Sequence, residues 1–357
     1  MSEWVTIQLK ELLTLKRGYD LPHSETKSGP YPVVASTNVR GYHNEYKVDG
    51  PVITVGRSGS IGHVQYIESK AWPLNTTLYM TDAKGNNKRF IYYFLKTIGL
   101  EQFNSGAGVP TLNRNHINLL KVKIPKNTIQ TKIADVLSTY DKLIENNNRR
   151  IQILEQTAEE LYKEWFVRMR FPGYEKTKFG KGIPEGWEVK KVKGLVKRYR
   201  YGSLYKENDV MQEGNVIVID QSEKDFLGFH NNEPDHFAGI DNPIILFGDH
   251  SCKMLIMTSP FSLSENVIPF NAENNLNTLF LFYAIRGLVQ TTEYKRHWSD
   301  LTNKRILVPD YSLQQKFEAK VKSIIILINE YKKSNFNLIK QRDLLLPRLM
   351  NGTITVK

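Results

Sequence analysis

The feature that most constrains the fold of this chain is a long internal repeat, in which a globular segment followed by an amphipathic helix occurs twice. Residues 49–53 (Asp-Gly-Pro-Val-Ile) return as residues 241–245 (Asp-Asn-Pro-Ile-Ile), and the apolar run at 90–95 returns at 279–284. The period of about 185 to 190 residues is far too long for a solenoid repeat. We therefore expect two complete domains, each followed by a long helix.

Both helical segments carry apolar residues at alternating spacings of four and three, which is the pattern of a coiled coil. The second seam follows the first at a fixed offset of 184 residues, which favours a matched pair over two unrelated amphipathic helices. One asparagine in each seam is expected to fix the register at some cost in stability. The predicted seam residues are Ile133, Leu137, Tyr140, Ile144, Asn147, Ile151, Leu154, Ala158, Leu161, Trp165, Phe317, Val321, Ile324, Ile328, Tyr331, Asn335, Leu338, Leu345 and Leu349.

Three local features of these helices give further predictions. Asn127 with Gln130, and Ser312 with Gln315, have the spacing of capping boxes at the two helix starts. Arg342 interrupts the second seam, and we expect its stem to pack while its charge stays in solvent.

The globular segments mix short β-type runs, turns and one helix each, which predicts an α+β fold. The strands are expected at 51–55, 62–67, 216–220 and 244–247, and the helices at 88–100 and 276–289. We predict two globular domains in tandem, joined by two long helices that form an antiparallel coiled coil with pseudo-twofold symmetry. The predicted segments are domain 1–125, helix 126–170, a Gly/Pro-rich linker at 171–186, domain 187–309, helix 310–350 and tail 351–357.

Composition and motifs argue against several classes of protein. The single cysteine, Cys252, excludes intramolecular disulfides and cysteine-based zinc sites. The chain shows no signal peptide and no apolar run of membrane-spanning length, so we expect it in the cytoplasm. The glycine-rich run at 56–62 is not a phosphate-binding loop of the nucleotide-binding type, and we expect it to be a turn between strands. The sequence carries no catalytic motif that we can identify, so we expect no catalysis and no cofactor or metal in this chain.

A formal net charge of +12 raises the odds of a polyanionic partner. Residues 1–125 hold 15 basic and 9 acidic side chains, whereas residues 186–310 hold 14 and 16. Basic side chains bind phosphate, while amides and arginines read base edges. The candidates for DNA contact are Lys16, Arg17, Tyr19, Arg40, Arg57, Ser58, Asn75, Thr76, Asn113 and Arg114 in the first domain, and Lys197, Arg198, Arg200, His250, Lys253, Asn266, Lys295, His297, Trp298 and Lys304 in the second.

Several motifs resemble those of the specificity subunit of type I restriction-modification systems, and the resemblance extends over essentially the whole chain. The most specific are Ala-Glu-Glu-Leu-Tyr-Lys-Glu-Trp-Phe-Val at 158–167 and Gly-Ile-Pro-Glu-Gly-Trp-Glu at 182–188. Others lie at 105–113, 247–250 and 344–352. The glycine-rich loop at 105–113 has no close copy near residues 297–304, which prevents residue-by-residue transfer there.

The resemblance implies that each domain is a target recognition domain, which reads one half of a bipartite double-stranded DNA target. It also implies that the coiled coil recruits two modification subunits, which methylate adenine with S-adenosylmethionine, and restriction subunits, which cleave with ATP and Mg as part of phage defence. Two rivals remain open at this point. One is a self-contained methyltransferase or nuclease, and the other is a coiled-coil scaffold with two protein-interaction domains.

Overall fold

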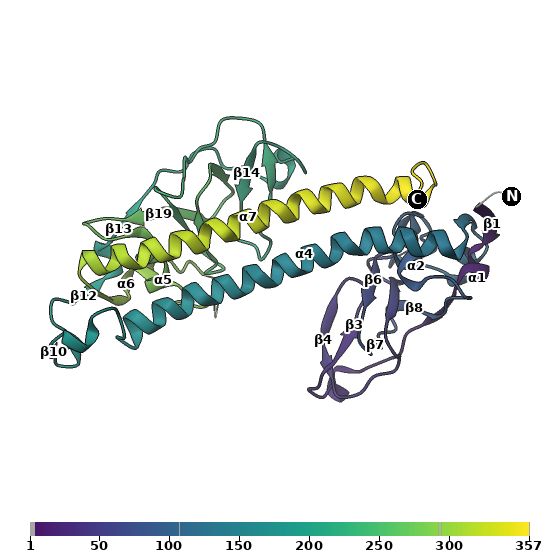
Figure 1. Cartoon of the computed structure of the whole chain (residues 1–357), viewed down its shortest axis with the longest axis horizontal. Coiled ribbons are helices and arrows are strands. Elements are labelled where there is room, and N and C mark those ends of the chain that lie inside the picture. Colours follow the sequence, from purple (N-terminus) through teal and green to yellow (C-terminus); the bar gives the residue numbers. More distant parts are fainter. Residues whose placement is uncertain (1–3, 107, 292, 294, 357) are drawn as a thin grey trace. The chain divides into compact units, whose positions relative to one another are not determined.

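The computed structural model describes residues 4–106, 108–291, 293 and 295–356. It divides the chain into two compact units: unit 1 comprises Met1–Asn147 and Ser334–Lys357, and unit 2 comprises Asn148–Lys333. Both ends of the chain belong to unit 1 (Figure 1). The residues at 1–3, Ala107, Thr292, Tyr294 and Lys357, which fall in segments predicted above, lie outside the described residues.

Unit 1 contains a four-stranded antiparallel sheet in the order β2-β8-β5-β6, a three-stranded sheet in the order β4-β3-β7 and a ribbon of β1 with β9. The elements are β1 Trp4–Gln8, α1 Leu9–Leu12, β2 Thr14–Arg17, η1 His23–Glu25, β3 Tyr31–Val34, β4 Val39–His43, β5 Val52–Gly56, β6 Val64–Ile67, β7 Trp72–Pro73, β8 Thr77–Asp82, α2 Lys88–Leu95, η2 Leu100–Gln102, α3 Arg114–Asn118, β9 Lys121–Pro125 and the start of α4 Asn127–Tyr162.

Unit 2 repeats this topology strand for strand, with sheets β13-β19-β16-β17 and β15-β14-β18 and the ribbon β12-β20. Its elements are η3 Lys163–Val167, η4 Tyr174–Lys176, β10 Phe179–Gly180, β11 Ile183–Pro184, β12 Glu188–Lys191, η5 Val192–Gly194, β13 Val196–Arg198, η6 Glu207–Asp209, β14 Val216–Ile219, β15 Gly228–His230, β16 Ile244–Gly248, β17 Met254–Met257, β18 Phe261–Leu263, β19 Val267–Ala272, α5 Thr278–Ile285, α6 Trp298–Asn303, β20 Arg305–Val308 and the start of α7 Tyr311–Met350. The α+β class and the tandem repeat are thus confirmed.

One of the two central strands in each four-stranded sheet, β5 in unit 1 and β16 in unit 2, shows why the sheets form from these sequences. β5 and β16 are buried at every position, which matches their nearly continuous apolar sequences and lets both faces of the strand pack. Helices α2 and α5 cover these sheets and contribute Phe90 and Phe280 to the two main hydrophobic cores. The turn predicted at 56–62 joins β5 to β6.

The predicted segments separate the two long helices from the domains. In the structure each long helix instead contributes to both units. The first part of α4 and the last part of α7 belong to unit 1, and the remainder of each belongs to unit 2. Leu137 and Leu349 lie in the core of unit 1, and Ala158 and Phe317 lie in the core of unit 2. Every predicted seam position is buried or half-buried. The seams therefore serve the domain cores as well as the helix pair.

Within each unit the two helices pack antiparallel. In unit 1 the amide of Asn147 donates to Oδ1 of Asn335 at 2.9 Å. Arg342 does not keep its charge in solvent, as we expected, because its guanidinium pairs with Asp141 at 2.7 Å and also with Asp343. The hydroxyl of Tyr93, on α2, donates to the same Asp141. This polar group therefore ties both long helices to the globular part of unit 1.

The helix starts differ from the predicted capping boxes. Nε2 of Gln130 donates to the carbonyl of Pro125 at 2.9 Å, and its Oε1 accepts from the backbone N–H of Asn87 at 3.1 Å. In unit 2 the equivalent residue is Gln314, not Gln315, and it makes the same two bonds with Pro309 and Asn277. The capping oxygen of α7 comes from Asp310, which accepts from Leu313 N–H and from the Ser312 hydroxyl.

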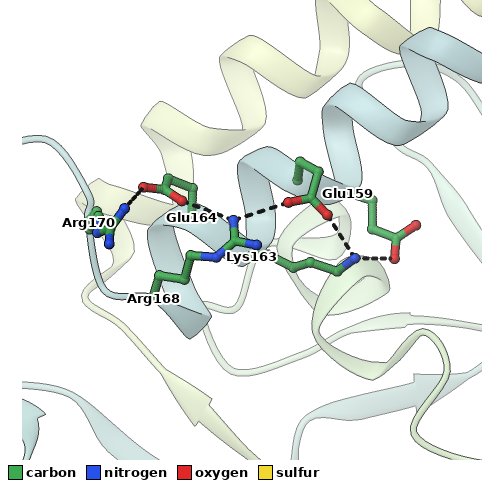
Figure 2. Close-up of polar contacts among 6 residues, drawn as sticks. Glu159, Lys163, Glu164, Arg168 and Arg170 are labelled. Carbon is green, nitrogen blue, oxygen red and sulfur yellow. Dashed lines mark hydrogen bonds and ion pairs between the residues drawn. The ribbon is translucent and has the colours of Figure 1, made fainter.

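A short π-helical turn, η3, follows α4, and a network of ion pairs runs from the last turn of α4 to the residues after η3 (Figure 2). Lys163 pairs with Glu159 and Glu160, Arg168 pairs with Glu160 and Glu164, and Arg170 pairs with Glu164, all between 3.0 and 3.1 Å. Exposed pairs of this kind contribute little one by one, but a network fixes local geometry.

The stretch 171–186, predicted as a Gly/Pro-rich linker, contains regular structure. It contains the hairpin of β10 with β11. Phe171, at its start, is buried against Trp187, with ring centroids 5.2 Å apart. Trp187 in turn contacts Phe166 in η3. Because the side chain of Phe171 packs into the core of unit 2, the glycine-rich stretch 171–186 is held in place between α4 and β12.

Candidate nucleic-acid interface

Unit 1 contains a polar cavity of about 330 Å³ that brings together arginines from three separate segments. Arg17 comes from β2, Arg57 follows β5 and Arg114 begins α3. All three are among the residues predicted to contact DNA. The complete lining is Arg17, Arg57, Leu78, Ser105, Thr111, Leu112, Asn113, Arg114 and Asn115.

The turn that presents Arg57 depends on two glycines. Gly62 has a φ of +80°, and a Cβ there would lie 2.5 Å from the backbone nitrogen of Glu101. A Cβ on Gly56 would lie 2.0 Å from the carbonyl oxygen of Ser60. Only glycine fits such close approaches of the backbone. The turn therefore holds Arg57 in a defined place at the end of a buried strand.

A glycine-containing loop closes the other side of the cavity and is bonded to this turn. The backbone N–H of Leu112 donates to the carbonyl of Arg57 at 2.8 Å, and that of Gly59 donates to the carbonyl of Pro110 at 3.1 Å. Within the loop, Oδ1 of Asn104 accepts from the N–H groups of both Gly106 and Thr111 at 3.0 Å. The loop and the turn are thus one hydrogen-bonded structure.

The charges in this cavity are only partly compensated. Arg17 pairs with the exposed carboxylate of Asp20 at 3.2 Å. Arg57 donates to the carbonyl of Asn75 at 3.4 Å, and Arg114 donates to the carbonyl of Leu15 at 3.3 Å. In the described part of the chain, no carboxylate forms an ion pair with either of these two arginines. The cavity is therefore electropositive.

Other predicted residues of unit 1 lie near the cavity or away from it. The backbone N–H groups of Arg57 and Ser58 donate to the carbonyl of Thr76, so Ser58, Asn75 and Thr76 are neighbours of the cavity. Lys16 is exposed on β2 and Arg40 on β4, where Arg40 borders a separate, smaller hollow. Tyr19 packs between Trp72 and Tyr79. Its hydroxyl lies 2.8 Å from that of Tyr79. Burial, together with this contact, raises the pKa of Tyr79 to about 12.

Unit 2 has the same backbone arrangement at this position but a different chemistry. The backbone N–H of His297 donates to the carbonyl of Asp249 at 2.8 Å, just as Leu112 donates to Arg57 in unit 1. Asp249 therefore takes the place of Arg57. Its carboxylate accepts from the backbone N–H of Trp298 at 2.9 Å and lies 3.8 Å from the guanidinium of Arg296.

Several predicted residues of unit 2 gather around this point. The guanidinium of Arg198 lies 5.5 Å from the ring centroid of Trp298, and Phe270 packs on that ring at 5.0 Å. Nδ1 of His250 lies 3.0 Å from the carbonyl oxygen of Lys295. His297 is buried and its Nδ1 bonds to Asp300, an interaction that lowers the pKa of that carboxyl.

Of the remaining candidates, only Asn266 contacts this group, through a backbone hydrogen bond to Asp249, as far as the described contacts show. Lys253 donates to the carbonyls of Asp220 and Lys224, and burial lowers its pKa. Asn266 has a φ of +62° and its carbonyl accepts from the N–H of Asp249. Lys197, Arg200 and Lys304 are exposed. Sequence reasoning missed Asp249 and Arg296 as parts of the candidate interface. The repeat could have placed Asp249, because the offset that aligns residues 49–53 with residues 241–245 also aligns Arg57 with Asp249.

The described residues contain no group of three or more His, Cys, Asp or Glu side chains arranged to hold a metal ion. None of the helices they form combines the length and the apolar character needed to span a membrane.

Comparison with known proteins shows what this chain is similar to. Residues 1–156 match the model of the type I restriction modification DNA specificity domain. The chain is 28% identical over 304 residues to the type I restriction enzyme MjaIX specificity subunit of Methanocaldococcus jannaschii, covering 75% of this chain and 69% of that protein. It is 24% identical over 319 residues to the MjaVIII specificity subunit of the same organism, covering 80% of this chain and 75% of that protein.

The fold is shared over almost the whole chain with a solved structure. The crystal structure of the type I restriction-modification system S subunit from M. genitalium superposes with a TM-score of 0.63 at 18% identity. The match covers 97% of this chain and 96% of that one. The fold expected from the resemblance is therefore confirmed.

Proposed function

We propose that this chain, a specificity subunit of the type I restriction-modification kind, reads a bipartite DNA target with one recognition domain in each unit. The observation that carries this proposal is the contrast between the units at one position. Unit 1 places Arg57 and unit 2 places Asp249 on the same backbone frame. Two copies of one scaffold that carry different polar groups can each contact DNA in a different way, which suits two half-sites of different sequence, because phosphates and base edges are recognised by different donors and acceptors.

The long helices are the proposed site for recruiting partners. Both helices carry large apolar side chains that are exposed in the isolated chain and therefore do not pack in the domain cores. We assign this surface to two adenine-methylating modification subunits and, through them, to restriction subunits. S-adenosylmethionine, ATP and Mg belong on those partners in this proposal, and this chain supplies no catalytic group. The exposed residues are Leu143, Ile153, Ile326, Leu327, Ile339 and Leu344.

The second candidate function is a scaffold that binds proteins and not DNA. The charge balance of residues 186–310, with 14 basic and 16 acidic side chains, favours it, because DNA-binding surfaces are usually basic. The arginine cavity of unit 1 argues against the scaffold function, because its positive charge suits the phosphates of DNA.

Purification of the full-length chain from its own host separates these functions. A specificity subunit brings down a methyltransferase, and the complex transfers labelled methyl groups from S-adenosylmethionine to adenine in DNA. The chain expressed alone transfers none, and it regains the activity when the purified partner is added back. Methyl transfer by the chain alone would show that it is an enzyme, and recovery of other partners without a methyltransferase would favour the scaffold.

A further inference from the structure

The arginine cavity of unit 1 has the properties of a site for one anionic group. Its lining combines three guanidinium groups with the polar side chains of Thr111 and Asn113. A volume of about 330 Å³ exceeds what a single phosphate group occupies, and the cavity opens to the surface, so one group of a long polymer can enter it. Guanidinium groups bind phosphate oxygens in a planar, two-point geometry.

The arginines are also held in place before any ligand arrives. Arg57 and Arg114 each donate to a backbone carbonyl, which restricts the side chain without neutralising its charge. The loop behind them is fixed by the Asn104 side chain and by the Leu112 bond to the turn. A prearranged cationic site loses less conformational entropy on binding than flexible surface lysines do.

The equivalent position of unit 2 provides an internal comparison. The carboxylate of Asp249 there accepts from the Trp298 N–H and lies near Arg296. A carboxylate repels a phosphate, so the frame that gathers positive charge in unit 1 presents a negative group in unit 2. The arginine cavity is therefore a feature of one unit and not a requirement of the shared fold.

We propose that the cavity formed by Arg17, Arg57 and Arg114 anchors a single phosphate of the DNA backbone, so that unit 1 gains an affinity for DNA that does not depend on sequence. This inference rests on the proposed function and adds a role for the site. Phosphate contacts set the position of a protein on DNA, whereas base contacts specify the sequence. These three arginines are accordingly assigned to positioning and not to base reading.

The test measures binding of the full-length chain to labelled duplexes of two unrelated sequences, from about 50 to about 200 mM salt. The double variant Arg57→Gln/Arg114→Gln is expected to flatten the plot of log affinity against log salt by about one unit, the contribution of one phosphate contact. Both duplexes should be affected equally. Lys10→Gln, which removes one positive charge from an exposed position of α1, should leave the slope unchanged.

Two further substitutions at the same position separate charge from fold. Arg57→Lys keeps the charge and should retain most of the slope. Arg57→Asp introduces the residue type of unit 2 and should weaken binding more than Arg57→Gln. If the double variant does not fold, Arg114→Gln alone, which breaks one described bond to Leu15, gives the same comparison.

The outcomes distinguish this inference from the proposed function. If the wild-type chain binds neither duplex at the lowest salt, the proposed function and the anchor both fail. If it binds, and the double variant has the slope of Lys10→Gln, the anchor alone is wrong. A variant that weakens one duplex and spares the other would show that the arginines read bases, which also overturns the anchor.

Discussion

Two buried glutamines show how single residues carry the repeat. Gln130 is 1% exposed and Gln314 is 2% exposed. Each amide links the carbonyl of the proline that ends a strand to the first N–H of a helix cap, Asn87 or Asn277. This one side chain joins the ribbon, the domain helix and the long helix in each unit.

Replacing Gln314 by leucine is therefore expected to destabilise unit 2 by about 1 to 3 kcal/mol, because it leaves a buried donor and a buried acceptor without partners. The adjacent Gln315 is exposed and provides a matched control, for which Gln315→Leu should change stability by no more than about 0.5 kcal/mol. Urea unfolding of both variants measures the difference. Equal effects would show that the Gln314 bonds contribute nothing specific.

Two histidines of unit 2 predict a dependence of stability on pH. Burial lowers the pKa of His230 and of His236, although Asp235 acts in the opposite direction on both. The unfolded chain binds protons at these residues near pH 6.5, while the folded chain resists protonation until the pH is lower. The unfolded state then holds more protons, so stability falls as the pH decreases below about 6.5.

Thermal unfolding between pH 7.5 and pH 5 measures this loss. The double variant His230→Asn/His236→Asn should show a smaller decrease in melting temperature over this range, whatever its stability at pH 7.5. His23→Asn, at an exposed position of η1, should behave as the wild type. The prediction is wrong if the double variant and the wild type lose the same stability on acidification.

At the residue scale the sequence predicted the candidates but not their grouping. Arg17, Arg57 and Arg114 were each identified, yet only folding brings segments 40 and 57 residues apart into one cavity. Tyr19 belongs to an aromatic cluster instead, which its basic neighbours gave no reason to expect. The rule for capping boxes is local, so it could not detect that Gln314 bonds to Asn277, 37 residues before it.

At the scale of elements the sequence was a better guide. The heptad pattern, a direct consequence of 3.5 residues per turn, located both helices, and the buried apolar strands β5 and β16 fell where they were expected. The division of each helix between two domain cores was not predicted, because a seam residue that packs on a helix and one that packs on a sheet look alike in sequence.

We also expect the length of the helix pair, α4 and α7, to set the spacing between the two DNA half-sites. Asn147 faces Asn335, and both helices pass from one unit to the other at this level. Inserting seven residues after Asn147 and seven after Ser334 preserves both seams and adds about 10 Å to each helix. We expect the unread spacer of the methylated motif to lengthen by about one to three base pairs while both half-sites stay the same. An active variant with an unchanged spacer would show that the helices do not set this distance.

At the scale of the whole molecule, the chain consists of two units that share a topology and differ in their polar side chains. The repeat and the motifs at 158–167 and 182–188 were sufficient to predict this architecture from sequence. The motifs could not give the target, because the base sequence is read by individual side chains, and the repeat does not preserve the polar side chains of the two units.

The central claim, that this chain directs DNA methylation to a bipartite target, is tested most directly by sequencing the methylated bases of the host genome with and without the gene. We predict that removing the gene abolishes adenine methylation at one motif made of two half-sites and an unread spacer, and that restoring the gene brings the motif back. The host must be one that normally expresses both the gene and its methyltransferase partner. If every methylated adenine motif persists in that host after the gene is removed, this claim is contradicted.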